Sequence, residues 1–192
     1  MGTAEKHTRY TYQEYLALEE AADFKSEYYD GEIYAMSGGT RDHNLIGTNV
    51  CGELRAALKG KDCSVFSSEL RVRIDKAESG VYPDGMVIYG PEAYYQDRAD
   101  VITNPMVIIE VLSESTKAWD YKGKFRKYEM LPSLQEYVLI EQKEPQVDIF
   151  RRNDQGFWVL ERYDGLATGV VFHSIGVTVP MKEIYYRVQF PA

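Results

Sequence analysis

The sequence predicts an α/β fold in which a mixed β-sheet lies between helices, with antiparallel hairpins added at the N- and C-terminal ends. Two patterns support this prediction: helical and strand-like segments alternate through most of the chain, and the last part consists of short apolar runs separated by turns. The 192 residues are 44% hydrophobic and 27% charged, which is ordinary for a soluble globular protein. This length predicts one domain over residues 1–192 with enough apolar residues to form a core.

The N-terminal part predicts two helices and a hairpin. A capping-box pattern predicts a helix from Thr11 to about Glu20. The dipeptide Asp30-Gly31, which is typical of tight turns, separates two predicted strands, Phe24–Tyr29 and Glu32–Met36. A second helix is predicted from Arg41 to a glycine cap at Gly60, because apolar residues recur every four positions. These apolar residues are Ile46, Val50, Leu54 and Leu58.

The middle of the chain predicts three strands, a loop and a helix. The predicted strands are Val65–Ile74, Val81–Tyr89 and Met106–Leu112. The segment Gly90–Pro105 is predicted to be a long, irregular and mobile loop. A helix is predicted from Lys117 to Met130, shortly before Pro132. The remaining predicted strands are Glu136–Glu141, Gln146–Arg152 and Phe157–Tyr163, followed by a short helix after Pro180.

Composition and charge restrict the class of protein. The formal net charge of −8 argues against general coating of nucleic acid but allows a local basic groove. Cys51 and Cys63 form no metal-type cluster, and no apolar run approaches the length needed to span a bilayer. We therefore expect a cytoplasmic protein without a membrane anchor. The 16 tyrosines indicate either a self-association surface, as in a homodimer, or simple packing of strands.

Two acidic residues on neighbouring predicted strands indicate a metal site. Asp84 follows Pro83, and Glu110 lies inside the apolar strand Met106–Leu112, where a lone carboxylate would be costly. Strand alternation places Asp84 on the same face as Met86 and Glu110 on the same face as Leu112, so both acids can share one face of the sheet. Two carboxylates that share a divalent cation would remove the cost of burial, and an oxygen-rich site favours Mg²⁺ or Mn²⁺.

Each acid also has a simpler interpretation. Pro83-Asp84-Gly85 is a common turn sequence, and Glu110 can be the buried partner of an arginine such as Arg71 or Arg73. The two acids together favour a metal site over these alternatives.

The helix after Glu110 adds a candidate cation. Asp120, Lys124 and Tyr128 are spaced by four and lie along one stripe, from which Lys124 can reach a phosphate or an attacking water. The alternative is a solvated helix face with a weak Asp120–Lys124 pair. The same helix is rich in basic residues, which predicts either a phosphate-facing patch or an ordinary charged helix. These basic residues are Lys117, Lys122, Lys124, Arg126 and Lys127.

Two other sets of polar residues are weaker candidates. His43, at the start of the second helix, is a possible proton-transfer group or outer ligand, although a histidine there is more often a cap or a surface residue. Glu27 and Glu32 flank the turn at Asp30-Gly31 and are expected to be exposed strand residues.

In this order, these motifs resemble the Uma-type family of restriction-endonuclease-like proteins, within the PD-(D/E)XK nuclease superfamily. The resemblance covers most of the chain and is most specific at Pro83-Asp84, at Glu110 and its neighbours, and at Asp120-x3-Lys124-x3-Tyr128. It implies a restriction-endonuclease-like fold with a three-stranded core sheet between two helices. Leu112 stands where the superfamily motif has lysine, and the resemblance moves that lysine to Lys124, with Lys122 as the alternative. Gly85 and Glu114 are further departures, standing where the family usually has an apolar residue and a proline.

The resemblance implies a Mg²⁺- or Mn²⁺-dependent endonuclease that hydrolyses phosphodiester bonds, with DNA as the expected substrate. Asp84, Glu110 and the backbone carbonyl of Val111 would hold the ion, and Lys124 would be the catalytic lysine. His43, Lys122, Asp120 and Tyr128 would be auxiliary residues. The alternative is a catalytically inactive, homo-oligomeric binding module on the same fold.

Overall fold

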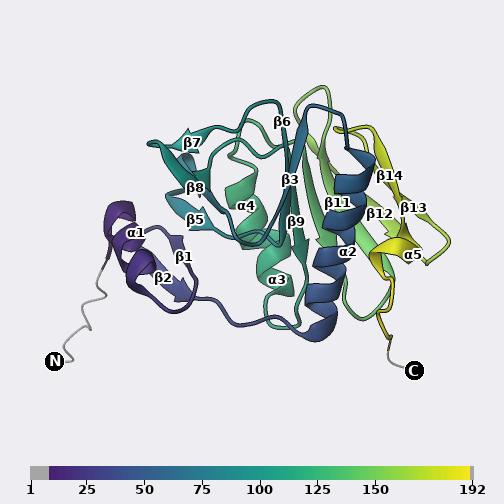
Figure 1. Ribbon diagram of the computed structural model, residues 1–192, viewed down its shortest axis with the longest axis horizontal. Helices are drawn as coiled ribbons and strands as arrows, with labels where there is room; N and C mark the ends of the chain where they lie inside the picture. Colours follow the sequence, from purple (N-terminus) through teal and green to yellow (C-terminus); the bar gives the residue numbers. More distant parts are fainter. Residues whose placement is uncertain (1–8, 191–192) are drawn as a thin grey trace.

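The computed structural model describes residues 9–190, which form two six-stranded mixed sheets with helices beside and between them (Figure 1). The single domain predicted over residues 1–192 includes residues 1–8 and 191–192, which lie outside the described residues. The α/β class with added antiparallel hairpins is confirmed, although the core is larger than the three strands that the resemblance implied.

Sheet A contains the N-terminal strands and has one parallel pair, β4 with β8, among antiparallel neighbours. Its strands are, in spatial order, β2 (Glu32–Ala35), β1 (Ser26–Tyr29), β5 (Ser79–Val81), β4 (Arg71–Ile74), β8 (Arg98–Ile102) and β7 (Tyr94–Tyr95). Sheet B has the parallel pair β9 with β10. Its strands are β12 (Trp158–Asp164), β11 (Gln146–Arg152), β10 (Glu136–Ile140), β9 (Val107–Val111), β6 (Gly85–Tyr89) and β3 (Cys63–Ser67). A separate hairpin consists of β13 (Gly169–Phe172) and β14 (Val177–Pro180).

The helices form where caps and apolar periodicity predict them. The capping box at Thr11 is present, because its hydroxyl accepts from the Glu14 N–H and the Glu14 carboxylate accepts from the Thr11 N–H. The helices are α1 (Tyr12–Ala21), α2 (Arg41–Ala57), α3 (Lys117–Trp119), η2 (Asp120–Lys124), α4 (Phe125–Tyr128) and α5 (Met181–Ile184), with a 3₁₀ turn η1 (Asp75–Ala77). None of the helices within residues 9–190 is long and apolar enough to cross a bilayer.

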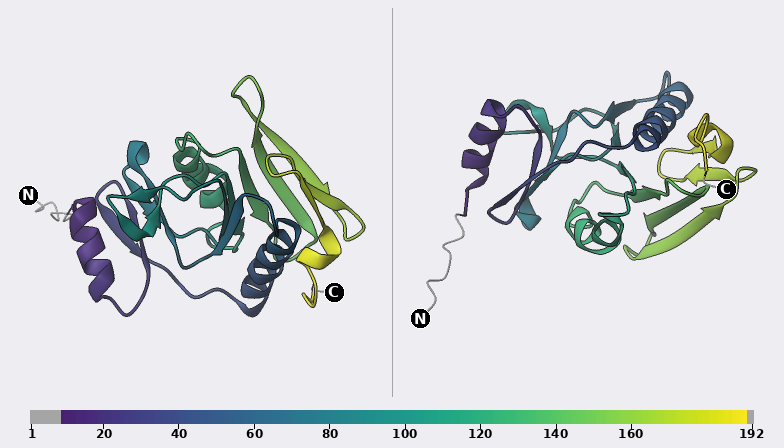
Figure 2. Two further views of the ribbon diagram at one scale, coloured as in Figure 1. Left: turned by 45° about the horizontal axis from the view of Figure 1, so that its top comes forward. Right: turned by 90° about the horizontal axis from the view of Figure 1, so that it is seen from below.

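Three hydrophobic clusters hold these elements in layers. Sheet B packs one face against α2, α5 and the β13–β14 hairpin. Its other face packs against α4 and the inner side of sheet A, so the helical segment from α3 to α4 lies between the two sheets. The outer face of sheet A packs against α1 through tyrosines that include Tyr12, Tyr15 and Tyr28. Seen from below, the segment from α3 to α4 lies between the N-terminal strands and the β11–β12 hairpin (Figure 2).

Two predicted strands are each divided between the sheets. The predicted strand Val65–Ile74 is β3 in sheet B followed by β4 in sheet A, and the predicted strand Val81–Tyr89 is the end of β5 in sheet A followed by β6 in sheet B. Pro83 lies in the second break. Because proline has no backbone N–H, it would interrupt the hydrogen-bond ladder if the strand continued through this position. The chain therefore passes from one sheet to the other next to Asp84.

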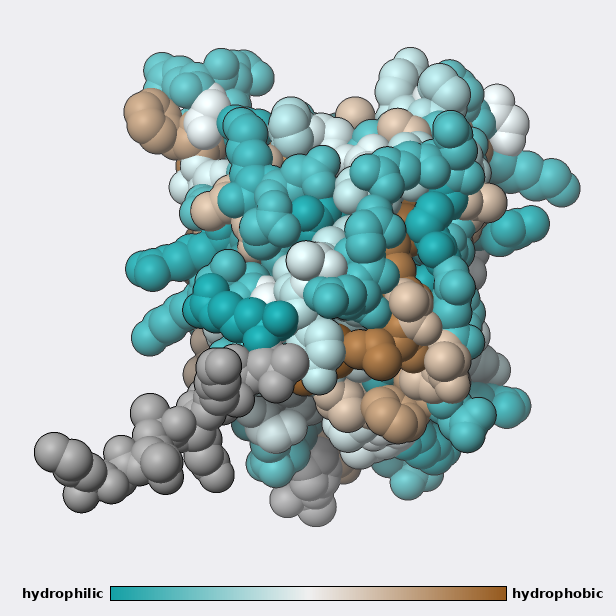
Figure 3. All heavy atoms as spheres, turned by 90° about the vertical axis from the view of Figure 1, so that its left-hand side faces the viewer, coloured by the Kyte–Doolittle hydropathy of each residue, from teal (hydrophilic) through white to brown (hydrophobic). Residues whose placement is uncertain are grey.

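The segment predicted as a mobile loop, Gly90–Pro105, is instead an ordered part of sheet A. It contains the hairpin of β7 and β8, and β8 pairs with β4. Gln96 and Asp97 form the turn with positive φ angles of 46° and 61°. The prediction was wrong because this turn lacks the glycine or asparagine that usually marks such a hairpin. Around these N-terminal elements the molecular surface is mostly hydrophilic, with one group of hydrophobic residues below the middle of the view (Figure 3).

Candidate active site

The candidate site lies where the chain crosses between the two sheets. Asp84, in the break before β6, accepts a 2.7 Å hydrogen bond from the backbone N–H of Val111 at the end of β9. Because Gly85 pairs with Ile109 in the antiparallel register of β6 and β9, this contact places Asp84 beside Glu110. Pro83-Asp84-Gly85 is therefore a crossing between sheets and not a simple surface turn.

Glu110 and Lys124 form a buried ion pair at this crossing. Glu110 on β9 is 4% exposed, and its Oε1 lies 2.8 Å from Nζ of Lys124 on η2. The hydroxyl of Tyr128 donates to the same carboxylate oxygen at 2.8 Å. Lys124 thus leans over the sheet, as its spacing from Asp120 and Tyr128 predicted.

The segment η2 is π-helical, a wider turn that often occurs at functional sites. Asp120 and Lys124 lie at its two ends, and both side chains are buried, at 4% and 6% exposure. A solvated Asp120–Lys124 surface pair is therefore excluded as the role of this helix.

Glu27 is a further member of the site, and its prediction as an exposed strand residue was wrong. Its side chain, on β1 of sheet A, is 13% exposed and lies 3.2 Å from Nζ of Lys124. It also accepts hydrogen bonds from the Tyr29 hydroxyl at 2.6 Å and from the Tyr82 N–H at 3.2 Å. The signal that singled out Glu110, an acid within a strongly aromatic or apolar strand, is also present at Glu27.

His43 joins the site from the opposite layer. The Thr40 hydroxyl caps α2 by accepting from the His43 N–H, which fixes His43 in the first turn of the helix. Its Nε2 lies 3.0 Å from Oδ1 of Asp84. We call the four carboxylates Glu27, Asp84, Glu110 and Asp120 the acid cluster; it faces two basic groups, Lys124 and His43.

The electrostatics of the acid cluster show an excess of negative charge. Burial raises the pKa of Glu110 well above its ordinary value; Lys124 opposes this shift, and the other three carboxylates increase it. Burial likewise raises the pKa of Asp120. Burial disfavours the charge on Lys124, but Glu110 and Glu27 outweigh burial and hold its pKa well above its ordinary value. The hydrogen bond with Asp84 raises the pKa of His43 in spite of burial.

The arginines Arg71 and Arg73, the alternative partners for Glu110, are engaged elsewhere. Arg71 pairs with Asp100 at 2.5 Å, and Arg73 pairs with Asp75 at 2.7 Å and lies 4.0 Å over the ring of Tyr12. Both belong to the layer between α1 and sheet A, so the buried partner of Glu110 is Lys124.

Comparison with known proteins identifies the family of this architecture. The family model described as "Putative restriction endonuclease", Uma2, matches residues 12–180. The chain belongs to the Uma2 family. It is 36% identical over 180 residues to the uncharacterized protein slr1290 of Synechocystis sp., covering 93% of this chain and 92% of that protein. It is also 36% identical over 155 residues to the uncharacterized protein sll1609 of the same organism, covering 81% and 88%.

A solved structure has the same fold. A crystal structure of a putative nuclease belonging to DUF820, from Anabaena variabilis, superposes with a TM-score of 0.74 at 21% identity, covering 92% of this chain and 97% of that one. The Uma2 chain thus has a nuclease-like fold, which agrees with the resemblance drawn from its motifs.

The basic residues of the Uma2 helix do not form the single phosphate-facing patch that was one of the two predicted alternatives. Lys117 pairs with Glu141, and Lys124 is buried in the acid cluster. Lys127 lies 5.2 Å over the ring of Tyr29. Lys122 and Arg126 are exposed, and neither forms an ion pair with any described residue. Lys124, and not Lys122, is therefore the lysine that the structure brings to the acids.

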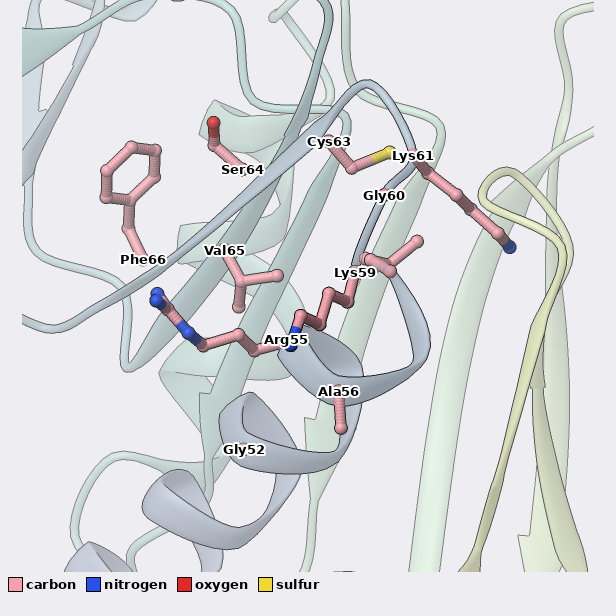
Figure 4. Close-up of a pocket in the computed structure, with 11 residues that line it drawn as sticks. Gly52, Arg55, Ala56, Lys59, Gly60, Lys61, Cys63, Ser64, Val65 and Phe66 are labelled. Atoms are coloured by element: carbon pink, nitrogen blue, oxygen red, sulfur yellow. The ribbon is translucent and has the colours of Figure 1, made fainter.

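A pronounced hollow of about 600 Å³ lies away from the acid cluster, between the C-terminal end of α2 and the edge strand β3 (Figure 4). Arg55, Lys59 and Lys61 line it, and none of the four clustered acids does. The acid cluster is therefore separate from this hollow.

The donor set of the acid cluster fits a hard divalent cation. Within residues 9–190, no three His, Cys, Asp or Glu side chains are gathered as a preformed metal-binding group. Mg²⁺, however, is commonly held by one or two carboxylates, with water and substrate phosphate completing its shell. Asp84 and Glu110 supply such carboxylates, and four acids against one lysine and one histidine leave negative charge for a cation to neutralise.

Proposed function

We propose that this protein is a metal-dependent nuclease that hydrolyses phosphodiester bonds, with DNA as substrate and internal positions as the site of cleavage. The observation that carries the proposal is the meeting of Asp84, Glu110 and Lys124, from three separate parts of the chain, at one place, with Glu110 and Lys124 buried and Asp84 partly exposed. Two carboxylates suit a divalent cation, and the cation together with the lysine would attract an anionic phosphate. Membership of the Uma2 family supports the same reaction class.

In this proposal Asp84, Glu110 and the Val111 carbonyl hold Mg²⁺ or Mn²⁺. When bound, the ion would polarise the phosphate and lower the pKa of an attacking water. Lys124 supplies a fixed ammonium that donates to a phosphate oxygen or orients the water, and Glu27 with Glu110 keeps it charged. Tyr128 holds the Glu110 carboxylate in place, and His43 does the same for Asp84.

Cleavage of supercoiled plasmid, linear duplex, single-stranded DNA and RNA tests the proposal, in Mg²⁺ or Mn²⁺ and in chelator. Glu110→Gln and Asp84→Asn should each abolish cleavage, because each removes a charge from the ion site but keeps the shape of the side chain. Both variants should remain folded. In Glu110→Gln the new amide oxygen can still accept from Tyr128, and Glu27 still pairs with Lys124.

Glu114→Gln is the matched control, because Glu114 is exposed and pairs only with Lys143 among the described residues. It should cleave at the rate of the unchanged protein. Cleavage by Glu110→Gln or Asp84→Asn at the rate of the unchanged protein would overturn the mechanism, and so would full cleavage in chelator. A folded protein that cuts none of these substrates would favour the non-catalytic, homo-oligomeric binding module.

A further inference from the structure

Two exposed aromatic rings each contact a buried tyrosine that adjoins the acid cluster. We call Tyr29, Tyr34 and Trp119 the aromatic platform. The ring of Tyr29 lies 5.4 Å from that of Trp119 and 5.7 Å from that of Tyr34, measured between centroids. Tyr29 is buried, whereas Trp119 is 42% exposed and Tyr34 is 51% exposed. Isolated exposed aromatics are common, but here two of them flank a third that leads directly into the site.

The platform is connected to the acid cluster by two contacts. The Tyr29 hydroxyl donates to the Glu27 carboxylate at 2.6 Å, and the same carboxylate lies 3.2 Å from Nζ of Lys124. Trp119 directly precedes Asp120, another member of the cluster. A ligand seated on the aromatic rings would therefore extend its neighbouring groups towards Lys124.

The position of the indole depends on a glycine. A Cβ added at Gly123 would lie 1.9 Å from the Trp119 ring, so the ring occupies the space that any side chain at this position would need. Glycine is otherwise unfavourable inside a helix. The helix thus contains a residue that costs helical stability and leaves room for the indole to pack against it.

Basic side chains on the helical segment that carries Trp119 favour a ligand with phosphate, while one acid, Glu32, accepts from the Tyr34 hydroxyl at the other end of the platform. Lys127 lies over the Tyr29 ring, and Lys122 and Arg126 are exposed on the same helical segment as Trp119. A nucleotide strand has the matching chemistry, because its bases present flat aromatic faces and its backbone is anionic. In a duplex those faces are already stacked on neighbouring bases.

We propose that the aromatic platform stacks unpaired nucleobases, so that the site acts on nucleic-acid strands whose bases are not paired. The inference rests on the proposed nuclease function and adds the form of its substrate. The ring of Trp119 and that of Tyr34 hold bases, and the exposed cations of the helix contact the backbone.

Fluorescence of Trp119 measures the stacking directly. The chain has two tryptophans, and Trp158→Phe leaves Trp119 as the single tryptophan, which can be excited selectively over the tyrosines, while keeping an aromatic ring against Phe125. Titration with a short oligothymidylate, in Ca²⁺ to bind without rapid cleavage, should quench this fluorescence. The same oligonucleotide in a duplex, and an abasic strand of equal length and charge, should quench it weakly.

Variants separate stacking from attraction to phosphate. In the otherwise unchanged protein, Trp119→Ala should weaken binding of the single strand by roughly tenfold to a hundredfold, measured by anisotropy of a labelled strand, and Trp119→Phe should restore most of it. Gly123→Ala should weaken binding in the same direction by displacing the indole. Binding of the abasic strand should be the same in all four proteins.

The outcomes distinguish this inference from the proposed function. Equal affinity for normal and abasic strands, or undiminished binding by Trp119→Ala, would overturn the platform even if Mg²⁺-dependent cleavage is observed. Base-dependent quenching in a protein that cleaves nothing would support the platform and overturn the nuclease. Preference for the duplex with the same dependence on Trp119 would also contradict the inference.

Discussion

Lys124 lies between two carboxylates, with Oε1 of Glu110 at 2.8 Å and Oε1 of Glu27 at 3.2 Å from its ammonium. All three side chains are largely buried, so water has little access to these ion pairs. Such charges depend on one another, because removal of one leaves an uncompensated charge in a medium of low polarity. The strand-borne glutamate was recognisable from sequence, since an acid within an apolar run needs a partner. The sequence did not show which cation Glu110 would pair with, because that depends on how the helix carrying Lys124 packs on the sheet.

Lys124→Met should therefore destabilise the protein by about 3–5 kcal/mol, the usual cost of breaking a buried pair from one side. The double variant Lys124→Met, Glu110→Gln should be more stable than Lys124→Met alone, because it also removes one of the stranded negative charges. Urea unfolding at neutral pH measures both. Strictly additive effects of the two substitutions would contradict the coupling.

At the scale of elements, the site exists because two strands break at the crossing between sheets. Regular alternation predicted unbroken strands over Val65–Ile74 and Val81–Tyr89, and periodicity alone gives no sign that a strand changes sheet. The break at Pro83 takes Asp84 out of the ladder, so that its carboxylate can accept from Val111 and His43. Gly85, a departure from the family pattern, also has a packing reason: a Cβ there would lie 2.7 Å from Sγ of Cys51 on α2.

Gly85→Ala should consequently destabilise the protein by about 1–3 kcal/mol, the usual cost of overpacking. Cys51→Ala in the same background should recover much of the loss, since it removes the sulfur that the new methyl group meets. The control is Gly52→Ala on α2, where an added Cβ meets nothing within 4 Å and helix propensity improves by up to about 1 kcal/mol. Equal effects of the two glycine substitutions on the urea midpoint would refute the packing argument.

At the scale of the whole molecule, the layers are held together by buried polar side chains in addition to the hydrophobic clusters. Asp148 on β11 is fully buried and accepts from the guanidinium of Arg162 on β12 and from the hydroxyl of Tyr121 on η2. Burial alone would raise the pKa of Asp148, but the bonds from Arg162 and Tyr121 outweigh burial and lower it. A lowered carboxyl pKa stabilises the folded state above the unfolded pKa, and this stabilisation is lost as pH falls through the folded pKa.

Asp148→Asn should lower the free energy of unfolding at pH 7 by roughly 1–3 kcal/mol, through loss of charge-assisted hydrogen bonds. The difference from the unchanged protein should persist down to about pH 4, the pKa of an unfolded aspartate, and shrink below it. Thermal unfolding followed by circular dichroism across this range provides the test. A difference that stays constant down to about pH 2 would show that the charge of Asp148 is not the cause.

The whole fold was predictable in class but not in extent. Hydrophobic patterning and the Asp30-Gly31 turn, with φ angles of 46° and 89°, correctly predicted an α/β protein with an N-terminal hairpin. The second six-stranded sheet was missed, because its strands are short and one hairpin turns through Gln96 and Asp97. Glu27 lies on a strand that was predicted, but its contact with Lys124 was missed because only the packing of the two sheets brings the two side chains together.

We propose that the acids brought together at the crossing of the two sheets hold a divalent cation. Calorimetric titration of the purified protein with Mn²⁺ tests this claim most directly, with Asp84→Asn as the site variant and Glu114→Gln as the control. We expect a saturable binding event in the unchanged protein and in Glu114→Gln that is lost or strongly weakened in Asp84→Asn. Absence of binding at millimolar Mn²⁺, or binding that Asp84→Asn leaves unchanged, would contradict it.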